Sequence, residues 1–300
     1  MITVIVLGVA AGGGVPQWNC NCENCREARH DPIRQSGQAS LAVSADARNW
    51  FLVNASPDLR AQVTATPALR PQDGHLRHTP IAGVVLTNAE VDAVAGLLSM
   101  REGSPFGIWG SLKVLDTLAA NPIFGVLPPA RVPRRALALG DALDLPLPDG
   151  SPSGLSVEAF EVPGKVAWYL EGSAEEGGDT VGLTFRAGGR TVHVVTACAR
   201  VTPELAERLR GADTVFFDGT LWSDDEMIRA GLSPKTGQRM GHLSISGSDG
   251  SIVALAPLGI ARKVFVHVNN SNPVLRPGSP ERQAAEAAGW IVPQPGSTFS

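Results

Sequence analysis

The chain has 300 residues, and its 25 lysines and arginines against 29 aspartates and glutamates give a formal net charge of −4. No basic stripe interrupts this mildly acidic sequence, so we do not expect nucleic acid as a partner. No apolar run approaches the roughly 18 residues of a membrane span. We expect a cytoplasmic protein that is large enough to bury its core without disulfides.

The first predicted element is a buried strand at 3–9, an almost continuous apolar run that is rich in β-branched residues. These opening residues lack the basic n-region and the cleavage site of a signal peptide. Gly12, Gly13 and Gly14 follow the strand. A glycine run in this place can cradle a phosphate, but the P-loop lysine and the spaced Rossmann glycines are missing. We therefore favour a tight turn that lets the backbone pass close to another group.

Three of the four cysteines, Cys20, Cys22 and Cys25, fall within six positions. Such a cluster is a poor disulfide framework, whereas three thiolates at this spacing can bind one tetrahedral zinc ion. Three incidental free thiols are the alternative, which the close clustering disfavours. We predict a structural zinc loop at about 18–30, because closed sulfur-rich sites leave no open position for a substrate.

The fourth ligand of this zinc must come from outside the cysteine cluster. His30 lies nearby in the sequence, and a polar cluster at 267–270 lies far along the chain. Cys198 is a weaker candidate, because it stands alone beyond a predicted strand.

The middle of the chain alternates predicted strands with predicted helices. Residues 40–43 and 49–53 predict a hairpin, and Pro57 predicts the start of a helix. His193 lies inside a strand of a second hairpin and is predicted to be structural. Further strands are predicted at 81–86, 137–147, 155–160, 180–185, 190–195, 214–217, 263–268 and 290–292, helices at 112–121, 202–209, 252–258 and 279–288, and a loop with solvated His75 and His78 at 69–80.

An acid-rich turn follows the strand at 81–86. Asn88, Glu90 and Asp92 stand at alternate positions where the period changes from that of a strand to that of a helix. Their side-chain oxygens suit a hard or borderline cation. Taken alone, the pattern favours the alternative, which is helix capping with Thr87 or Asn88 as the N-cap and Glu90 as a first-turn acid. Asp92 lies beyond the cap, so it needs another partner.

Two other buried strands also end in polar residues. Asp218 directly follows the strand at 214–217, and His267 stands where the strand predicted at 263–268 breaks into an asparagine cluster. His242 stands before a predicted turn. Sites are commonly built where strands end. We predict that these ends, the acid-rich turn and the glycine run converge on one metal site.

The order of these features resembles the metallo-β-lactamase superfamily, whose fold is a four-layer αβ/βα sandwich with metal at the strand ends. Residues 88–93 stand where the superfamily carries its His-X-His-X-Asp-His motif, and only Asp92 matches it. Asp218 matches the later bridging acid and His267 the last histidine, but 162–165, where the middle histidine is expected, contains none. The resemblance implies one α/β domain over residues 1–300 whose two-zinc hydrolase site is dismantled.

A closer similarity within this superfamily rests on six stretches, which are 12–25, 54–60, 96–103, 217–222, 240–242 and 267–273. Through these stretches the sequence resembles a family that acts in the synthesis of pyrroloquinoline quinone (PQQ). The resemblance implies iron- and O2-dependent hydroxylation of the tyrosine-derived ring of a cross-linked Glu–Tyr intermediate, the activity of a non-haem Fe(II) oxygenase. A histidine commonly follows the motif aspartate in that family, and Ala93 replaces it here.

The same resemblance implies two sets of metal ligands. The set that is expected to hold the active-site Fe(II), and to act in catalysis, is Asp92, Asp218, His267 and His242. The superfamily's phosphodiesterases carry the fourth zinc ligand three positions after the last active-site histidine. The implied structural zinc set is therefore Cys20, Cys22, Cys25 and Asn270.

Arg101 and Lys165 are predicted to pair with carboxylates of the substrate, a role that suits the bidentate fork of arginine. An ion pair between Arg101 and Glu102 is the alternative. The expected partners are a small-molecule or peptide-derived PQQ intermediate and O2, with a homodimer left open and with neither nucleic acid nor a membrane. Two other functions stay open: a zinc hydrolase, and a non-enzymatic carrier of PQQ or its precursor.

Overall fold

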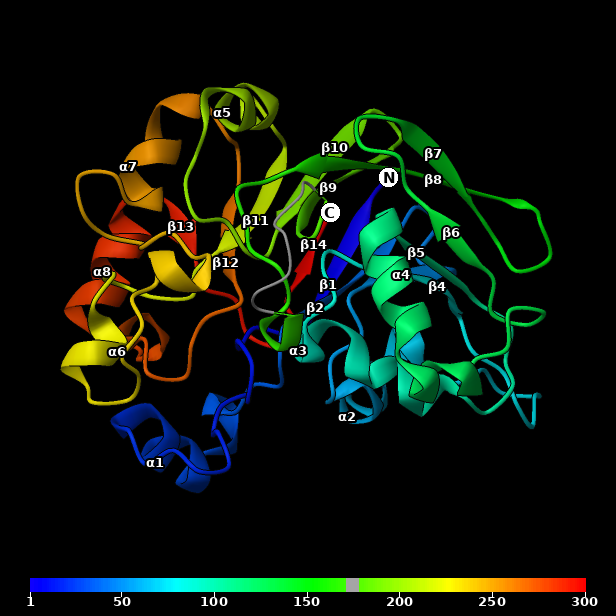
Figure 1. The fold of residues 1–300 in the computed structure, drawn as a ribbon, viewed down its shortest axis with the longest axis horizontal. Coiled ribbons are helices and arrows are strands. Elements are labelled where there is room, and N and C mark those ends of the chain that lie inside the picture. The colour runs from blue at the N-terminus through cyan, green and yellow to red at the C-terminus, as the bar shows by residue number, and fades with distance from the viewer. Residues whose placement is uncertain (171–177) are drawn as a thin grey trace.

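The computed structural model describes residues 1–170 and 178–300, which form two facing β-sheets with helices on their outer sides (Figure 1). Each sheet has seven strands within these residues. The first sheet runs in the order β14 (Thr298–Phe299), β1 (Thr3–Gly8), β2 (Ser40–Ser44), β3 (Trp50–Val53), β4 (Ile81–Val85), β5 (Gly107–Gly110), β6 (Arg134–Ala136). The second runs in the order β13 (Trp290–Ile291), β12 (Lys263–Val266), β11 (Thr214–Asp218), β10 (Arg190–Val195), β9 (Val181–Ala187), β8 (Pro152–Glu161), β7 (Ala142–Pro146).

The helices form the two outer layers. Those beside the first sheet are α2 (Leu59–Ala65), α3 (Val91–Val94) and α4 (Leu112–Ala120), and those beside the second are α5 (Pro203–Leu209), α6 (Glu226–Arg229), α7 (Ser251–Leu255) and α8 (Pro280–Ala287). The remaining helix, α1 (Glu23–His30), lies apart from both sheets (Figure 1). Within the described residues, no helix combines the length and the apolar character that crossing a bilayer requires. These layers confirm the predicted αβ/βα sandwich.

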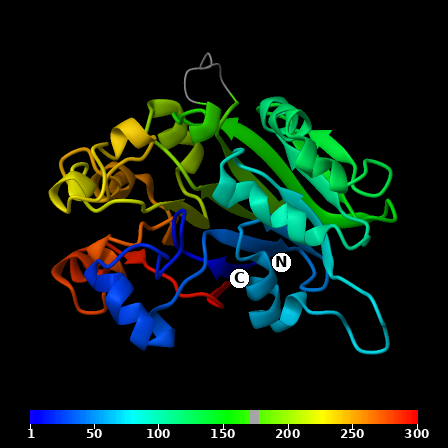
Figure 2. The same cartoon turned by 60° about the horizontal axis from the view of Figure 1, so that its bottom comes forward.

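Parallel pairing brings several strand ends to one edge of the sandwich. Strands β3 to β6 pair in parallel in the first sheet, and β10 to β13 do so in the second. The residues that follow parallel strands gather at the carboxyl edge of a sheet, which is where α/β proteins place their sites. At the opposite edge strand of the first sheet, β14 pairs antiparallel with β1. This pairing brings the two termini near each other (Figure 2).

The period of two along the first sheet separates two apolar cores. In β3, Phe51 and Val53 face the core between the sheets, whereas Trp50 and Leu52 face the core under the outer helices. All four side chains are at most 2% exposed. Because burial of such a side chain contributes about 1.5–3 kcal/mol, a shift of register by one residue would be strongly unfavourable.

Most predicted elements are confirmed, but several boundaries are wrong. The strand predicted at 137–147 begins only at Ala142, and β6, which precedes it, belongs to the other sheet. The helix predicted from Pro57 begins at Leu59. After β4, the capping interpretation is wrong, since Glu90 and neither Thr87 nor Asn88 is the N-cap of a helix that is only four residues long. Strands β5, β6 and β14 were not predicted at all.

His193 is structural, as predicted. It is 3% exposed, and its Nδ1 lies 3.0 Å from Thr184 Oγ1. Burial, helped by the charges of Arg186 and Arg208, lowers the pKa of His193 to about 4. The folded protein therefore keeps this imidazole neutral at a pH where the unfolded chain binds a proton.

We expect His193 to make the protein acid-sensitive. As the pH falls from 7 to 4, the imidazole of His193 binds a proton more readily in the unfolded state than in the folded state. This difference lowers the free energy of unfolding by about 3 kcal/mol. The variant His193→Gln lacks this titration. Urea denaturation at both pH values should show the smaller pH dependence in the variant, and equal pH dependence in both proteins would contradict this assignment.

Candidate metal centre

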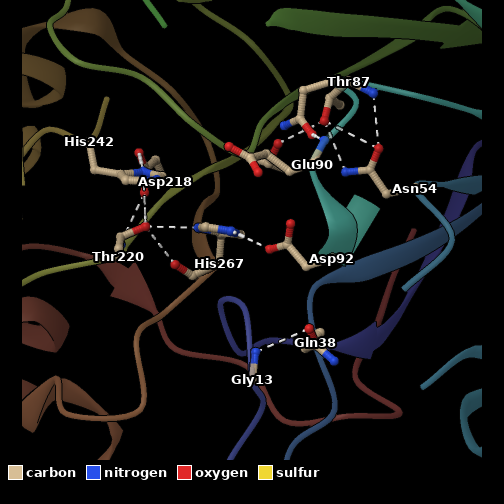
Figure 3. Close-up of polar contacts among 12 residues, drawn as sticks. Gly13, Gln38, Asn54, Thr87, Glu90, Asp92, Asp218, Thr220, His242 and His267 are labelled. Atoms are coloured by element: carbon tan, nitrogen blue, oxygen red, sulfur yellow. Dashed lines mark hydrogen bonds and ion pairs between the residues drawn. The ribbon is translucent and has the colours of Figure 1, made fainter. Parts of the chain in front are cut away.

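Asp92, Asp218, His242 and His267 meet at the carboxyl edge of the two sheets (Figure 3). Ligand atoms of Asp218, His242 and His267 all lie within 4.8 Å of one another. Asp92 joins this group through its Oδ2, which lies 3.0 Å from His267 Nε2. The predicted convergence of residues from three distant stretches of the chain is therefore what the structure shows.

His267 occupies an unusual backbone conformation directly after β12. Its φ of +56° lies in the left-handed region, which residues other than glycine seldom adopt and which is common at functional sites. Its imidazole is close to that of His242, with the ring centroids 5.1 Å apart and the planes inclined by 20°. The sharp turn after the strand thus presents His267 to residues of both sheets.

The charges of Asp92 and His267 support each other. Burial acts to raise the pKa of Asp92, but the hydrogen bond and charge of His267 outweigh it and hold that pKa below its ordinary value. Burial acts to lower the pKa of His267, but the hydrogen bond and charge of Asp92 outweigh it and raise that pKa. In the absence of a cation, the pair is therefore a carboxylate and an imidazolium over a wide pH range.

These shifts predict a pH-dependent metal affinity. A metal ion must displace the proton of His267, so affinity should rise about tenfold per pH unit below the raised pKa of His267 and level off above it. Asp92 is already ionised in this range and adds no further dependence. Titration of the protein with Co2+ between pH 5.5 and pH 8 measures the slope, and a flat profile would show that His267 is not a ligand.

The glycine run passes beside this centre. Ala11 N–H donates to the carbonyl of Val268 at 2.8 Å, which fixes the run next to the turn that carries His267. A Cβ added to Gly12 would lie 3.7 Å from Asp92 Oδ2. The run is a tight turn, as predicted, in which Gly14 N–H donates to the carbonyl of Ala11 at 3.1 Å and Gly13 and Gly14 have φ of +96° and +71°.

A buried polar network ties the two sheets together beside the centre. Asn54, which follows β3 with a φ of +60°, donates from Nδ2 to Thr87 Oγ1 at 2.9 Å and accepts the Thr87 N–H at 2.9 Å. Thr87 Oγ1 lies 3.0 Å from Thr196 Oγ1, at the end of β10 in the other sheet. The network fixes the separation of the strand ends that carry the ligands (Figure 3).

The acid-rich turn contributes only Asp92 to the centre. Asn88 Oδ1 accepts the N–H of Glu90 at 3.0 Å, and Glu90 turns away toward Lys165 and the N–H of Trp168. Asn88 and Glu90 therefore do not join Asp92 around a shared cation, although their spacing would suit one. Ala93 is buried, and its carbonyl accepts the N–H of Ala55 at 2.7 Å, so this position supports the backbone instead of the metal.

The cysteine cluster forms a second candidate site. The Sγ atoms of Cys20, Cys22 and Cys25 lie within 4.8 Å of one another. Asn270 Nδ2 lies 3.0, 3.5 and 3.3 Å from these sulfurs, and a 180° rotation of the amide would present its oxygen to a cation in the same place. Burial and the neighbouring sulfurs raise the pKa of Cys22 to about 11, so a cation that binds here displaces protons.

The other candidates for the fourth position do not reach this cluster. His30 is exposed at the end of α1. Cys198 is buried elsewhere, where its Sγ donates to the carbonyl of Arg200 at 3.1 Å and burial raises its pKa to about 12. Asn270 is thus the side chain that the structure brings to the three sulfurs.

The two predicted substrate-binding residues lie in different places. Lys165 Nζ is 3.4 Å from Glu90 Oε1, and Lys165 lines a cavity of about 800 Å3 whose walls include none of the four residues of the centre. Arg101 instead forms the ion pair with Glu102 that was the alternative prediction, at 3.5 Å, and lines a smaller, separate cavity. The structure gives a substrate role of Arg101 no support.

Sequence reasoning missed Thr220, Asn54 and Tyr169. Thr220 contacts Asp218 and both histidines, and Tyr169 donates from its hydroxyl to the carbonyl of Ala89 at 2.7 Å. A signal was present for Asn54, because the stretch 54–58 is a polar strand end like those that were chosen. Nothing in the sequence marks Thr220 or Tyr169.

Comparison with known proteins defines the class first. The β-lactamase superfamily domain matches residues 49–268, and a diphosphatase of the PhnP family shares the fold, with a TM-score of 0.68 at 20% identity over 99% of this chain and 96% of that one. The fold and the site edge are those of a metallo-β-lactamase-type protein.

Closer relatives narrow the class. The coenzyme PQQ synthesis proteins B of Rhodopseudomonas palustris (strain BisB5) and Bradyrhizobium diazoefficiens (strain USDA 110) are 61% and 56% identical, each over 99% of both chains. The structure of zinc-bound PqqB from Methylobacterium extorquens aligns with a TM-score of 0.94 at 47% identity over 99% of both chains. The chain belongs to the coenzyme PQQ synthesis protein B family of the β-lactamase superfamily.

Proposed function

We propose that this chain acts in PQQ biosynthesis as a metal-dependent enzyme that hydroxylates the tyrosine-derived ring of a cross-linked Glu–Tyr intermediate, with Fe(II) and O2. The pathway rests on the names of relatives that share more than half of the sequence. The observation that carries the metal-dependent part is the meeting of two imidazoles and carboxylates at the strand ends.

The chemistry of the donors fits two different metals at the two sites. Imidazole nitrogens and carboxylate oxygens suit iron, and open positions around such sets serve non-haem Fe(II) oxygenases. Three clustered thiolates suit a closed structural zinc site. Iron bound at this centre would activate O2, of which one oxygen atom would enter the ring and the other would leave as water, with two electrons and two protons from an external reductant.

The chain itself supplies binding and orientation. Thr180 Oγ1 donates to the carbonyl of Lys165 at 2.9 Å, and Lys165 thereby keeps a fixed backbone position at the wall of the neighbouring cavity. Lys165 also packs beside the turn that carries His242, because a Cβ on Gly241, the residue before His242, would lie 3.1 Å from Lys165 Cγ. We assign Lys165 to a carboxylate of the substrate in this cavity.

A matched pair of variants tests this assignment. A charge-assisted hydrogen bond contributes about 1.5–3 kcal/mol, so Lys165→Ala should raise KM for the cross-linked substrate by about tenfold or more. Arg101→Ala removes a cation of similar reach from the separate cavity and should change KM by less than about twofold. Steady-state kinetics of both variants measure these changes in KM. An equal rise of KM in Arg101→Ala would show that Lys165 alone does not form the site for the substrate carboxylate.

The experiment that tests the function as a whole combines metal analysis with oxygen consumption. The protein is reconstituted with Fe(II) without oxygen, and its metals are measured by mass spectrometry. The proposal expects one zinc and one iron per chain, and O2 uptake that depends on the ring-containing substrate. Iron-loaded protein that consumes no O2 with this substrate would sink the oxygenase proposal.

A zinc hydrolase is the second candidate, and the zinc bound in the Methylobacterium extorquens relative favours it. The substitutions of Asn88, Glu90 and Ala93 for motif histidines argue against it, since two-zinc hydrolases need those imidazoles. Two zinc ions per chain that resist replacement by iron would bring this candidate to first place.

A further inference from the structure

Asp218 has no free acceptor site for a metal ion. Its Oδ1 accepts the N–H of Thr220 at 3.0 Å and the Thr220 hydroxyl at 2.6 Å. Its Oδ2 accepts the N–H of Cys198 at 2.9 Å and lies 2.7 Å from His242 Nδ1. A carboxylate offers about four lone-pair sites, and these contacts occupy all of them.

The side chain of Asp218 is less exposed than those of the other three residues of the centre. The side chain of Asp218 is 0% exposed, whereas those of His242, His267 and Asp92 are 12%, 16% and 18% exposed. Asp218 is thus sealed behind the imidazoles, while the other three side chains reach the accessible side of the centre.

Thr220 fixes which nitrogen each imidazole presents. The hydroxyl has one proton, and two neighbours that can only accept, Asp218 Oδ1 and the carbonyl of His267 at 2.8 Å, compete for it. Toward the imidazoles the Thr220 oxygen therefore acts as an acceptor, 2.9 Å from His267 Nδ1 and 3.1 Å from His242 Nδ1 (Figure 3). Both Nδ1 atoms are then proton donors, which leaves both Nε2 atoms for a cation.

The surroundings of the two Nε2 atoms indicate where the metal would bind. His267 Nε2 faces Asp92 Oδ2 at 3.0 Å, and His242 Nε2 makes no hydrogen bond to any described residue. We propose that the metal is held by Asp92 together with Nε2 of His242 and of His267, and that Asp218 and Thr220 are positioning residues that hold the imidazoles through Nδ1.

Asp218 stands at the position of the superfamily's bridging acid, but in this proposal it orients an imidazole and does not bind the metal. A carboxylate behind a ligating histidine orients the ring and raises its basicity without touching the metal. Two imidazoles and one carboxylate with open positions are the donor set of non-haem Fe(II) oxygenases. The inference rests on the proposed function only in requiring that a metal ion binds at this centre.

Metal binding by matched variants tests the inference. Fe(II) affinity and stoichiometry are measured without oxygen, by competition with a chelator, for the wild type and for variants whose cysteine-site zinc content and thermal transition are intact. Asp92→Ala and His242→Ala should lose the iron. Asp218→Asn and Thr220→Val should keep one iron with an affinity about 10–100-fold lower, the usual effect of losing a partner behind a ligand.

Two further variants separate positioning from general damage. Thr220→Ser restores the hydroxyl and should bring the affinity to within about threefold of the wild type. Thr184→Val removes the hydroxyl that bonds to His193 Nδ1, a threonine–histidine pair remote from the centre, and should leave iron binding unchanged. X-ray absorption of the iron-loaded Asp218→Asn variant should still count two imidazoles.

The outcomes distinguish this inference from the proposed function. Loss of iron from Asp218→Asn as complete as from Asp92→Ala would make Asp218 a ligand and overturn the inference, as would wild-type affinity in Thr220→Val. If the predicted pattern holds but the iron-loaded protein consumes no O2, the inference stands and the oxygenase function fails. A wild type that binds no metal here overturns both.

Discussion

Replacing Asp92 by alanine is expected to remove the active-site metal while the cysteine-site metal stays. Asp92 is the carboxylate that faces His267 Nε2, and it is ionised because His267 holds its pKa below the ordinary value. Its removal leaves two imidazoles and no accessible anion at the centre, so iron affinity should fall by more than about 100-fold, beyond the effect of losing an outer-shell partner. After anaerobic Fe(II) reconstitution, mass spectrometry should find one zinc and one iron in the wild type but only zinc in Asp92→Ala.

Asp58→Asn is the matched control for this experiment. Asp58 is another acid after a strand, and its Oδ2 accepts the N–H of Gln38 at 2.8 Å, outside the centre. This variant should keep both metals. If the wild type and Asp92→Ala hold the same single zinc, the strand-end site binds no metal, and the carrier of PQQ or its precursor becomes the leading function.

The convergence of Asp92, Asp218 and His267 could be predicted because buried strands leave a clear sequence signal. Each of these residues follows an apolar run, and parallel strands bring their carboxyl ends to one edge. No comparable sequence signal indicated how many strands each of the two sheets contains. β5 is a four-residue strand with a glycine at each end, and β14 is two residues long, so neither shows a period.

The acid-rich turn shows why local patterns gave the wrong partners. The spacing of Asn88, Glu90 and Asp92 suits a shared cation, but Lys165, 75 residues after Glu90, captures that carboxylate. The helix after the turn continues as a 3-10 helix at Ala95–Met100, where Gly96 packs directly against the carbonyl of Ser56 and any Cβ would collide. Both outcomes depend on tertiary contacts that periodicity and propensity do not contain.

Thr220 could not be found from sequence for a related reason. A threonine two residues after a strand-end acid is ordinary, and its importance comes from one oxygen that contacts Asp218, His242 and His267 at once. Arg101 is the opposite case, since its charge suggested a substrate role that its place in the fold does not support. Residue type predicts what a side chain can do, whereas only the fold determines which groups it meets.

Replacing Cys25 by serine is expected to abolish the cysteine-site zinc and to lower thermal stability. Serine cannot supply the third thiolate of a tetrahedral sulfur site. Because binding to the folded state alone stabilises that state, we expect a loss of about 3 kcal/mol or more. With an unfolding entropy of about 2.1 cal/mol/K per residue, this loss corresponds to a decrease in Tm of about 5 °C or more. Zinc analysis and calorimetry measure both effects.

The same variant should weaken the strand-end site, because one loop serves both sites. Asn270, whose amide faces the three sulfurs, is three residues after His267. Asn24 of α1 donates to the carbonyls of Asn270 and Asn272 at 2.9 Å each, and in Figures 1 and 2 α1 lies beside this C-terminal segment. Asn272 in turn donates to the carbonyl of Gly219 at 3.0 Å, next to Thr220.

Loss of zinc therefore loosens the turn that presents His267, and iron affinity in Cys25→Ser should fall by about tenfold, an effect of the size expected for a supporting contact. Cys198→Ser is the matched control, since serine can also donate to the carbonyl of Arg200 and this thiol is remote from the three sulfurs. It should keep its zinc and its iron affinity. Unchanged iron affinity in zinc-free Cys25→Ser would show that the loop holds His267 without the zinc, through the asparagine contacts alone.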